Sequence, residues 1–127
     1  MFQLDLRNDK SIYEQIIDKF KELIMLEKIK CGEKMPSVRE LSKKLGVNPN
    51  TIQKAYRELE RQGYVYTASG VGTFVADKKD IFPDDDDLKK AKEAISEAFR
   101  DLLFLGLSFE EAYNIAVETI KEREKDL

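Results

Sequence analysis

The sequence predicts a mostly α-helical protein with one small β-hairpin, and three observations support this. Apolar residues recur at helical spacing in three segments between residues 11 and 63, which predicts three amphipathic helices. Two runs of β-branched and aromatic residues then flank a glycine-containing link at residues 68–72, a pattern typical of a hairpin. The composition changes after residue 79, and two more helical patterns follow. This order predicts a winged helix-turn-helix at residues 1–79 and a C-terminal two-helix hairpin at residues 80–127.

The first predicted helix begins at Ser11, which is followed three residues later by Glu14, the spacing of a capping box. Its apolar stripe predicts a helix that ends at about Lys28. Ahead of this helix, three apolar residues alternate with polar ones and allow a short strand: Phe2, Leu4 and Leu6.

The second and third predicted helices are short and closely spaced. Ser37 can cap the start of the second helix, and Gly46 ends it, because glycine readily takes a left-handed conformation. Asn48 is a good cap for the third helix, with Pro49 at its first position, and Gly63 closes it. Two helices joined by such a short glycine-containing turn predict a helix-turn-helix.

The C-terminal part predicts two helices separated by Gly106, the second starting with a capping box of Ser108 and Glu111. A lone helical hairpin has no core that could bury both apolar faces. The hairpin could fold back on the winged helix, but its apolar residues exceed what one docking stripe needs. We therefore expect a homodimer, with these residues at its interface: Ile95, Phe99, Leu102, Leu103, Phe109, Tyr113 and Val117.

The composition excludes several classes of function. The chain has no His and one Cys, which excludes a catalytic triad, a His-ligated zinc and an intramolecular disulfide. We accordingly expect no enzyme, no catalytic residues, no metal site and no cofactor. No apolar run has the length of a membrane helix, and the N-terminus is unlike a signal peptide. A cytoplasmic protein without a membrane partner is expected.

Charge is divided unevenly along the chain, although its net value is only −3. Residues 1–79 contain 15 Lys/Arg and 11 Asp/Glu, a net charge of +4, whereas residues 80–127 contain 7 and 14, a net charge of −7. Such asymmetry indicates an anionic partner for the basic part.

The third helix has the side chains of a DNA reader. In a helix-turn-helix the second helix of the motif enters the major groove, where Asn and Gln pair with adenine and Lys reaches guanine or phosphate. Gly70 and Gly72 would let the backbone of the wing approach phosphates, although both also suit a tight turn. The sequence therefore predicts double-stranded DNA as the partner, with these candidate contacts: Ser37, Arg39, Asn48, Asn50, Thr51, Gln53, Lys54, Gly70 and Gly72.

Four segments in order resemble the GntR family of bacterial regulators: PSVREL at 36–41, VNPNTIQKAY at 47–56, LERQG at 59–63 and GVGTFV at 70–75. YEQI at residues 13–16 also fits. The resemblance covers roughly residues 10–76, and the short remainder is similar to the YtrA-type branch, whose members end in a small helical dimerisation region. It implies a DNA-binding transcriptional regulator. Together with the homodimer expected from the C-terminal helices and the lack of room for an effector domain, this predicts a repressor that binds a near-palindromic operator.

The resemblance also implies roles for single positions. Arg39 matches a family arginine that contacts DNA, and Ser37 matches a neighbour that meets phosphate. Gln53 lies where many relatives have an arginine that reads guanine, which implies an operator with a preference for A·T pairs. Gly70 matches the wing-tip glycine, and Val71 lies where some relatives have a basic residue, which implies less charge on this wing. The chain has no room for the ligand-binding domain of larger relatives, and no effector is assigned.

Three alternatives stay open at this point. The winged helix could be a protein–protein interaction module that binds no DNA, because a fold does not determine a function. The four aspartates at residues 84–87 could hold Mg²⁺ or Ca²⁺, although consecutive residues at a helix start converge poorly on one ion. Cys31, beside Lys30, could act as a redox switch.

Overall fold

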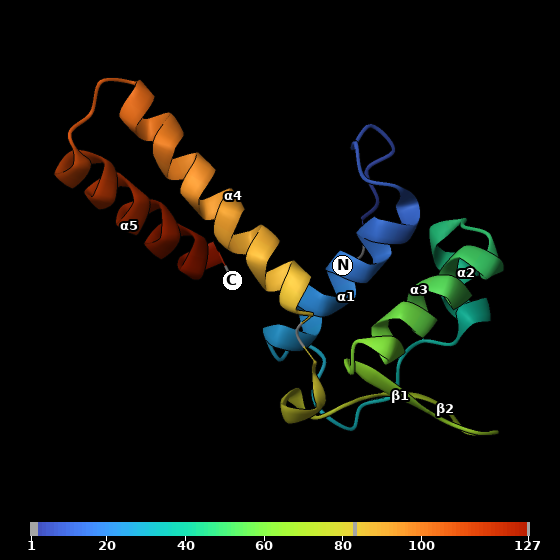
Figure 1. Cartoon of the computed structure of the whole chain (residues 1–127). Helices are drawn as coiled ribbons and strands as arrows, with labels where there is room; N and C mark the ends of the chain where they lie inside the picture. Colours follow the sequence, from blue (N-terminus) through green and yellow to red (C-terminus); the bar gives the residue numbers. More distant parts are fainter. Residues whose placement is uncertain (1–2, 83, 127) are drawn as a thin grey trace. The chain divides into compact units, whose positions relative to one another are not determined.

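The computed structural model describes residues 3–82 and 84–126, and the chain divides into two compact units, residues 1–82 and 83–127 (Figure 1). The first unit contains three α-helices and a β-hairpin, and the second contains two α-helices. The elements are α1 (Ile12–Met25), α2 (Val38–Leu45), α3 (Pro49–Arg61), β1 (Val65–Ala68), β2 (Gly72–Val75), α4 (Asp85–Phe104) and α5 (Phe109–Asp126). The expected fold class, a winged helix-turn-helix followed by a helical pair, is confirmed.

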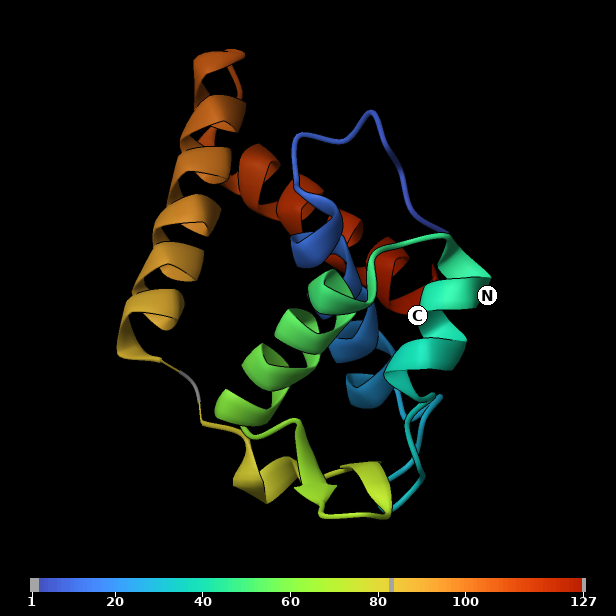
Figure 2. The ribbon, with the colours of Figure 1, turned by 90° about the vertical axis from the view of Figure 1, so that its right-hand side faces the viewer.

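The core of the first unit lies between α1 and α3, which pack against each other (Figure 2). Phe20 and Tyr56 meet edge to face there, with ring centroids 5.7 Å apart. The helices and the hairpin all contribute fully or nearly fully buried apolar side chains, among them Ile16, Phe20, Leu41, Ile52, Leu59, Val65 and Val75. This core fixes the orientation of α2 and α3.

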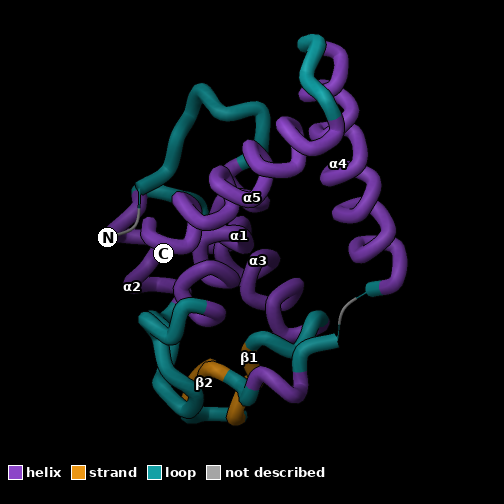
Figure 3. The backbone as a smooth tube through the Cα atoms, turned by 90° about the vertical axis from the view of Figure 1, so that its left-hand side faces the viewer, coloured by secondary structure: helices purple, strands orange, loops and turns teal. Residues whose placement is uncertain are grey.

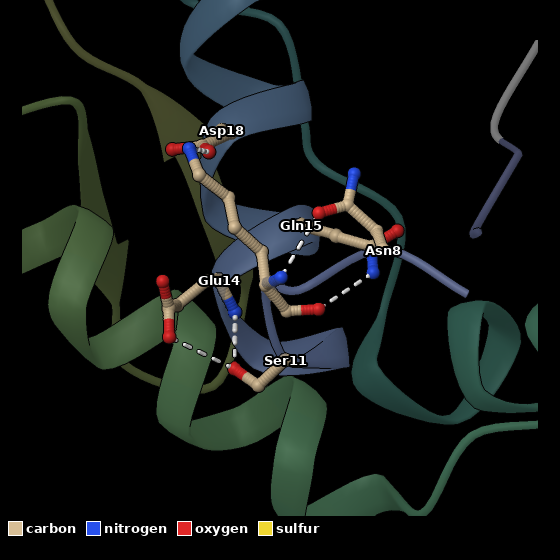
Figure 4. A network of polar contacts seen from close by, with 6 residues as sticks. Asn8, Ser11, Glu14, Gln15 and Asp18 are labelled. Carbon is tan, nitrogen blue, oxygen red and sulfur yellow. Dashed lines mark hydrogen bonds and ion pairs between the residues drawn. The ribbon is translucent and has the colours of Figure 1, made fainter. Parts of the chain in front are cut away.

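The start of α1 is held by the predicted cap and by one glutamine. The N–H of Glu14 donates to Ser11 Oγ (3.2 Å), and the Ser11 hydroxyl donates to a Glu14 carboxylate oxygen (3.3 Å) (Figure 4). Gln15 Nε2 donates to the carbonyls of Asp5 (2.7 Å) and Lys10 (2.9 Å), while the N–H of Asp5 donates to Gln15 Oε1 (2.8 Å). These bonds hold residues 5–10 as a turn. The short strand that the sequence allows does not form at Leu4 or Leu6, and Phe2 lies outside the described residues.

The expected end of α1 at about Lys28 is also wrong, because the helix ends at Met25. Glu27 takes a left-handed conformation (φ 58°) without being glycine. Its N–H donates to the Ile24 carbonyl (3.1 Å) and that of Lys28 to the Leu23 carbonyl (2.9 Å). This pair of bonds is a Schellman cap, which usually places glycine at that position.

The remaining helix caps follow the predictions. The N–H of Glu40 donates to Ser37 Oγ (3.0 Å), and the N–H of Asn50 donates to Asn48 Oδ1 (2.8 Å). Gly46 is left-handed at the end of α2. The short turn between α2 and α3 that the sequence predicts is therefore formed by its expected residues.

Strands β1 and β2 form the hairpin (Figure 3). They are antiparallel, and Val65 pairs with Val75 and Ala68 with Gly72. A further segment, ahead of α2, adds to the free edge of β2. The N–H of Met35 donates to the Thr73 carbonyl (2.7 Å), and the N–H of Val75 donates to the Glu33 carbonyl (2.9 Å). The hairpin is thereby attached to the chain immediately before the helix-turn-helix.

The boundary between the two units lies at residues 82/83 rather than at the expected 79/80. A short 3₁₀ helix at Lys78–Asp80 follows the hairpin. After it, the N–H of Phe82 donates to the carbonyl of Gln62 (3.0 Å) at the end of α3. This hydrogen bond attaches the three extra residues, 80–82, to the end of α3 in the first unit.

The second unit is an antiparallel pair of helices, α4 and α5, joined through Gly106 (Figure 1). Asp84 caps α4, and Ser108 and Glu111 form the predicted capping box, with hydrogen bonds of 3.1 Å in both directions. Phe99 meets Phe109 edge to face at 5.1 Å. Among the described residues, no helix has the length and apolar character needed to cross a membrane.

Candidate nucleic-acid interface

Helix α3 has a buried apolar face and an exposed polar face. Its buried residues anchor it on α1, and the side chains on the other face are all exposed: Asn50, Gln53, Lys54 and Arg57. None of these four forms an ion pair within residues 3–82 or 84–126. This face therefore offers amide, ammonium and guanidinium donors to an external partner.

The two cap residues keep hydrogen-bond donors for a ligand. Ser37 Oγ and Asn48 Oδ1 act as acceptors within the protein. A hydroxyl and an amide can donate as well as accept. Within the described part of the chain, neither the Ser37 hydroxyl nor the Asn48 amino group donates to another residue, so both can bind a phosphate oxygen. The exposed start of each helix adds the positive end of the helix dipole.

A groove of about 540 Å³ lies between α3 and the hairpin. It unites predicted site residues from three separate segments: Ser37 from the start of α2, Gln53 from α3, and Gly70 and Gly72 from the hairpin. Glu60 is the acidic residue of its lining, and its carboxylate accepts a long hydrogen bond from the Thr67 hydroxyl (3.4 Å). The sequence grouped these residues by motif, and the structure brings them to one groove.

The other predicted residues lie outside this groove. Arg39, Asn48, Asn50 and Lys54 are exposed on the helices beside it. Thr51 is half-buried and lines a different hollow, of about 500 Å³, together with Leu45 and Val47. Its side chain is therefore less available to a partner than its position in the motif predicts.

Tyr56 connects the two helices of the motif. Its ring is buried, and its hydroxyl donates to the carbonyl of Pro36 (2.7 Å), immediately before α2. Burial raises the pKa of the Tyr56 hydroxyl, with a smaller contribution from the Glu40 carboxylate. The tyrosine therefore stays neutral and remains a donor, and this bond fixes the start of α2 relative to α3.

Glu58 occupies the last turns of α3, where its carboxylate accepts from Arg61 Nε (2.9 Å), Arg61 Nη2 (2.6 Å) and Gln62 Nε2 (2.7 Å). The hydrogen bonds from Arg61, more than any other interaction, lower the pKa of Glu58 to about 2. An acid at this end of α3 is thus neutralised by its own helix, and its charge opposes a polyanion less strongly.

Two residues that line the groove were not among the DNA contacts predicted from the sequence. Arg57 follows Gln53 by four positions and shares its exposed face and the groove, a relation that helical spacing predicts. Lys34 also lines the groove. It precedes α2 in the sequence, and no local pattern connects it with a hairpin some forty residues later.

The second unit has a largely exposed apolar surface. Within residues 84–125, Ala112 is the one side chain that is fully buried. Four of the predicted interface residues, Phe99, Leu102, Leu103 and Val117, are half-buried between the helices. The other three remain exposed, with exposed fractions of 70% for Ile95, 68% for Phe109 and 57% for Tyr113.

The sequence comparisons agree with this geometry. Residues 12–75 match the family model described as bacterial regulatory proteins, gntR family. A curated relative, the HTH-type transcriptional repressor YtrA of Bacillus subtilis (strain 168), is 38% identical over 127 residues, which cover all of this chain and 95% of the relative.

Solved structures give the same result. The transcriptional antiterminator of Listeria monocytogenes EGD-e aligns with a TM-score of 0.75 and 39% identity, over 94% of this chain and 89% of that one. The AraR DNA-binding domain in complex with operator ORE1 aligns with a TM-score of 0.52 and 34% identity, over 60% of this chain and 93% of that one. The chain belongs to the GntR family of bacterial regulatory proteins and is a winged helix-turn-helix transcriptional regulator, not an enzyme.

Proposed function

We propose that this chain is a repressor that binds a near-palindromic operator as a homodimer. The observation that carries the DNA contact is the exposed face of α3, whose side chains from Asn50 to Arg57 form no ion pair among the described residues and lie beside the groove of the hairpin. In this docking, α3 enters the major groove and the hairpin reaches the adjacent backbone. Arg39, Ser37 and Asn48 bind phosphates on either side of α3.

The exposed apolar residues of α4 and α5 support the homodimer. Ile95, Phe109 and Tyr113 continue the apolar stripes that hold the two helices together, yet they remain in solvent. A second copy of the same helical pair would cover them through a two-fold interface. Such a dimer places two copies of α3 about 34–36 Å apart, one turn of DNA.

The preference for A·T pairs rests on Gln53. Its amide is exposed at the groove and can donate to and accept from adenine in the major groove. Repression is supported by the relative from Bacillus subtilis, which is a transcriptional repressor. A dimer bound across a promoter would repress by excluding the polymerase.

Replacing Arg39 or Gln53 by Ala is expected to weaken binding to a duplex selected by the wild-type protein by about 5- to 150-fold, the loss of one good base contact or charged contact. Both side chains are exposed, so the unfolding temperature should not change. Fluorescence anisotropy with the labelled duplex measures the affinity. Arg7→Ala is the matched control, because Arg7 is exposed and lies outside the groove.

The same titrations distinguish this proposal from the protein–protein module. Wild-type affinity in the double variant Arg39→Ala/Gln53→Ala would contradict the docking described above. A wild-type protein that binds no duplex at any salt concentration would favour the interaction module instead.

A further inference from the structure

The tip of the hairpin carries no charged residue. Residues 68–72 are Ala, Ser, Gly, Val and Gly, and Val71 is 60% exposed there. A wing that approaches a phosphate backbone through this segment would offer backbone N–H groups and the Ser69 hydroxyl, but no cation. Affinity for DNA depends chiefly on cations placed against phosphates, so a wing of this composition needs charge from elsewhere.

Lys34 lies on the edge of the hairpin, although it precedes α2 in the sequence. It forms an antiparallel bridge with Phe74, flanked by the hydrogen bonds of Glu33 and Met35 to β2. Side chains alternate between the two faces of a sheet. Lys34 therefore shares a face with Phe74 and with Gly72, which lies diagonally across from it towards the tip.

Gly72 provides the space for this lysine side chain. A Cβ atom at Gly72 would lie 2.7 Å from Lys34 Cε and 3.5 Å from Lys34 Nζ. The aliphatic part of Lys34 thus lies against the open face of Gly72, whose φ of 146° itself favours glycine. Gly72 was predicted to allow a close approach of the backbone to phosphate, but here its open face is occupied by Lys34.

The ammonium group of Lys34 is available to an anion. Lys34 is exposed and forms no ion pair within the described part of the chain. It lines both the groove of α3 and a neighbouring hollow of about 730 Å³, where Ser37, Lys43 and Lys44 also lie. Glu40 lines that hollow too, without pairing with Lys34.

We propose that Lys34 is the phosphate-binding cation of the wing, with its side chain lying along the open face of Gly72. The inference rests on the DNA interface proposed above and adds a contact to it. A lysine from outside the hairpin thereby supplies the charge that the hairpin tip lacks.

The test measures how the affinity for sonicated mixed-sequence duplex DNA depends on salt, because a phosphate contact acts on every sequence. Lys34→Gln is expected to lower the slope of log K against log salt by about 0.9 for each Lys34 that contacts a phosphate. Lys28→Gln is the control, since Lys28 is exposed and outside the groove; one exposed charge is removed in each case.

A rescue variant separates charge from folding. Adding Val71→Lys to Lys34→Gln returns a cation to the wing tip and should restore the slope, even if Lys34→Gln alone lowers the unfolding temperature. Equal slopes for Lys34→Gln and Lys28→Gln would overturn the inference, as would a double variant that fails to recover. A wild-type protein without salt-dependent binding would instead refute the DNA interface itself.

Discussion

Replacement of Gly63 by Ala is expected to destabilise the first unit by about 3–5 kcal/mol, in the range of the most severe single substitutions. Gly63 has a φ of 85°, and a Cβ atom there would lie 1.9 Å from the carbonyl oxygen of Asp80. The close neighbour is backbone, which cannot rotate away as a side chain can. The residues after the hairpin would have to leave the end of α3, together with the hydrogen bond from Phe82 to Gln62.

Gly46→Ala is the matched control for this substitution. Gly46 also follows a helix with a positive φ, 65°, but an added Cβ would meet nothing within 4 Å. Gly46→Ala should lower the free energy of unfolding only by the strain of a left-handed alanine, about 1–2 kcal/mol. Urea unfolding of both variants gives the difference, and equal losses would mean that Asp80 does not pack on Gly63 in solution.

Two exposed apolar residues of the second unit should control the oligomeric state. The double variant Ile95→Asp/Tyr113→Asp is expected to be monomeric, because it places charges in the apolar surface that a second copy would cover. A monomer loses the gain from binding two half-sites at once, so affinity for the operator should fall about 100-fold or more. Sedimentation velocity and anisotropy measure the two effects on the same samples.

Ser96→Asp/Asn114→Asp serves as the control, since it adds the same charges at exposed polar positions next to those residues. The half-buried Phe99 is a poor choice for this test, because its ring contacts Phe109 within one copy. A dimer that survives in Ile95→Asp/Tyr113→Asp would place the interface elsewhere.

Local chemistry explains why much of the fold could be predicted. Ser37, Asn48 and the pair of Ser108 and Glu111 cap their helices as their residue types indicate, because a cap depends on side chains within three positions. The helical stripes and the hairpin are equally local patterns. The helix-turn-helix and its wing could therefore be predicted from short segments of the sequence.

Other features depended on contacts that short segments do not contain. The left-handed Glu27 ends α1 early, and its residue type gives no signal for that conformation. The boundary at residue 82 depends on a hydrogen bond from Phe82 to Gln62.

The candidate site could likewise be predicted where it depends on local patterns, and not where it depends on contacts between distant segments. Helical spacing indicates which residues lie on the exposed face of α3. The same spacing places Arg57 on that face, four residues after Gln53, so Arg57 could also have been predicted. Lys34 could not be predicted as a groove residue, because its position depends on pairing with β2, some forty residues away.

The most direct test of the central claim, a dimer that reads two half-sites, is selection of bound fragments from a random duplex pool by the purified full chain. The proposed docking predicts enrichment of an inverted pair of half-sites with centres about 10 base pairs apart, with A·T pairs favoured where Gln53 reads. A single unpaired half-site, or no enrichment over the starting pool, would contradict it.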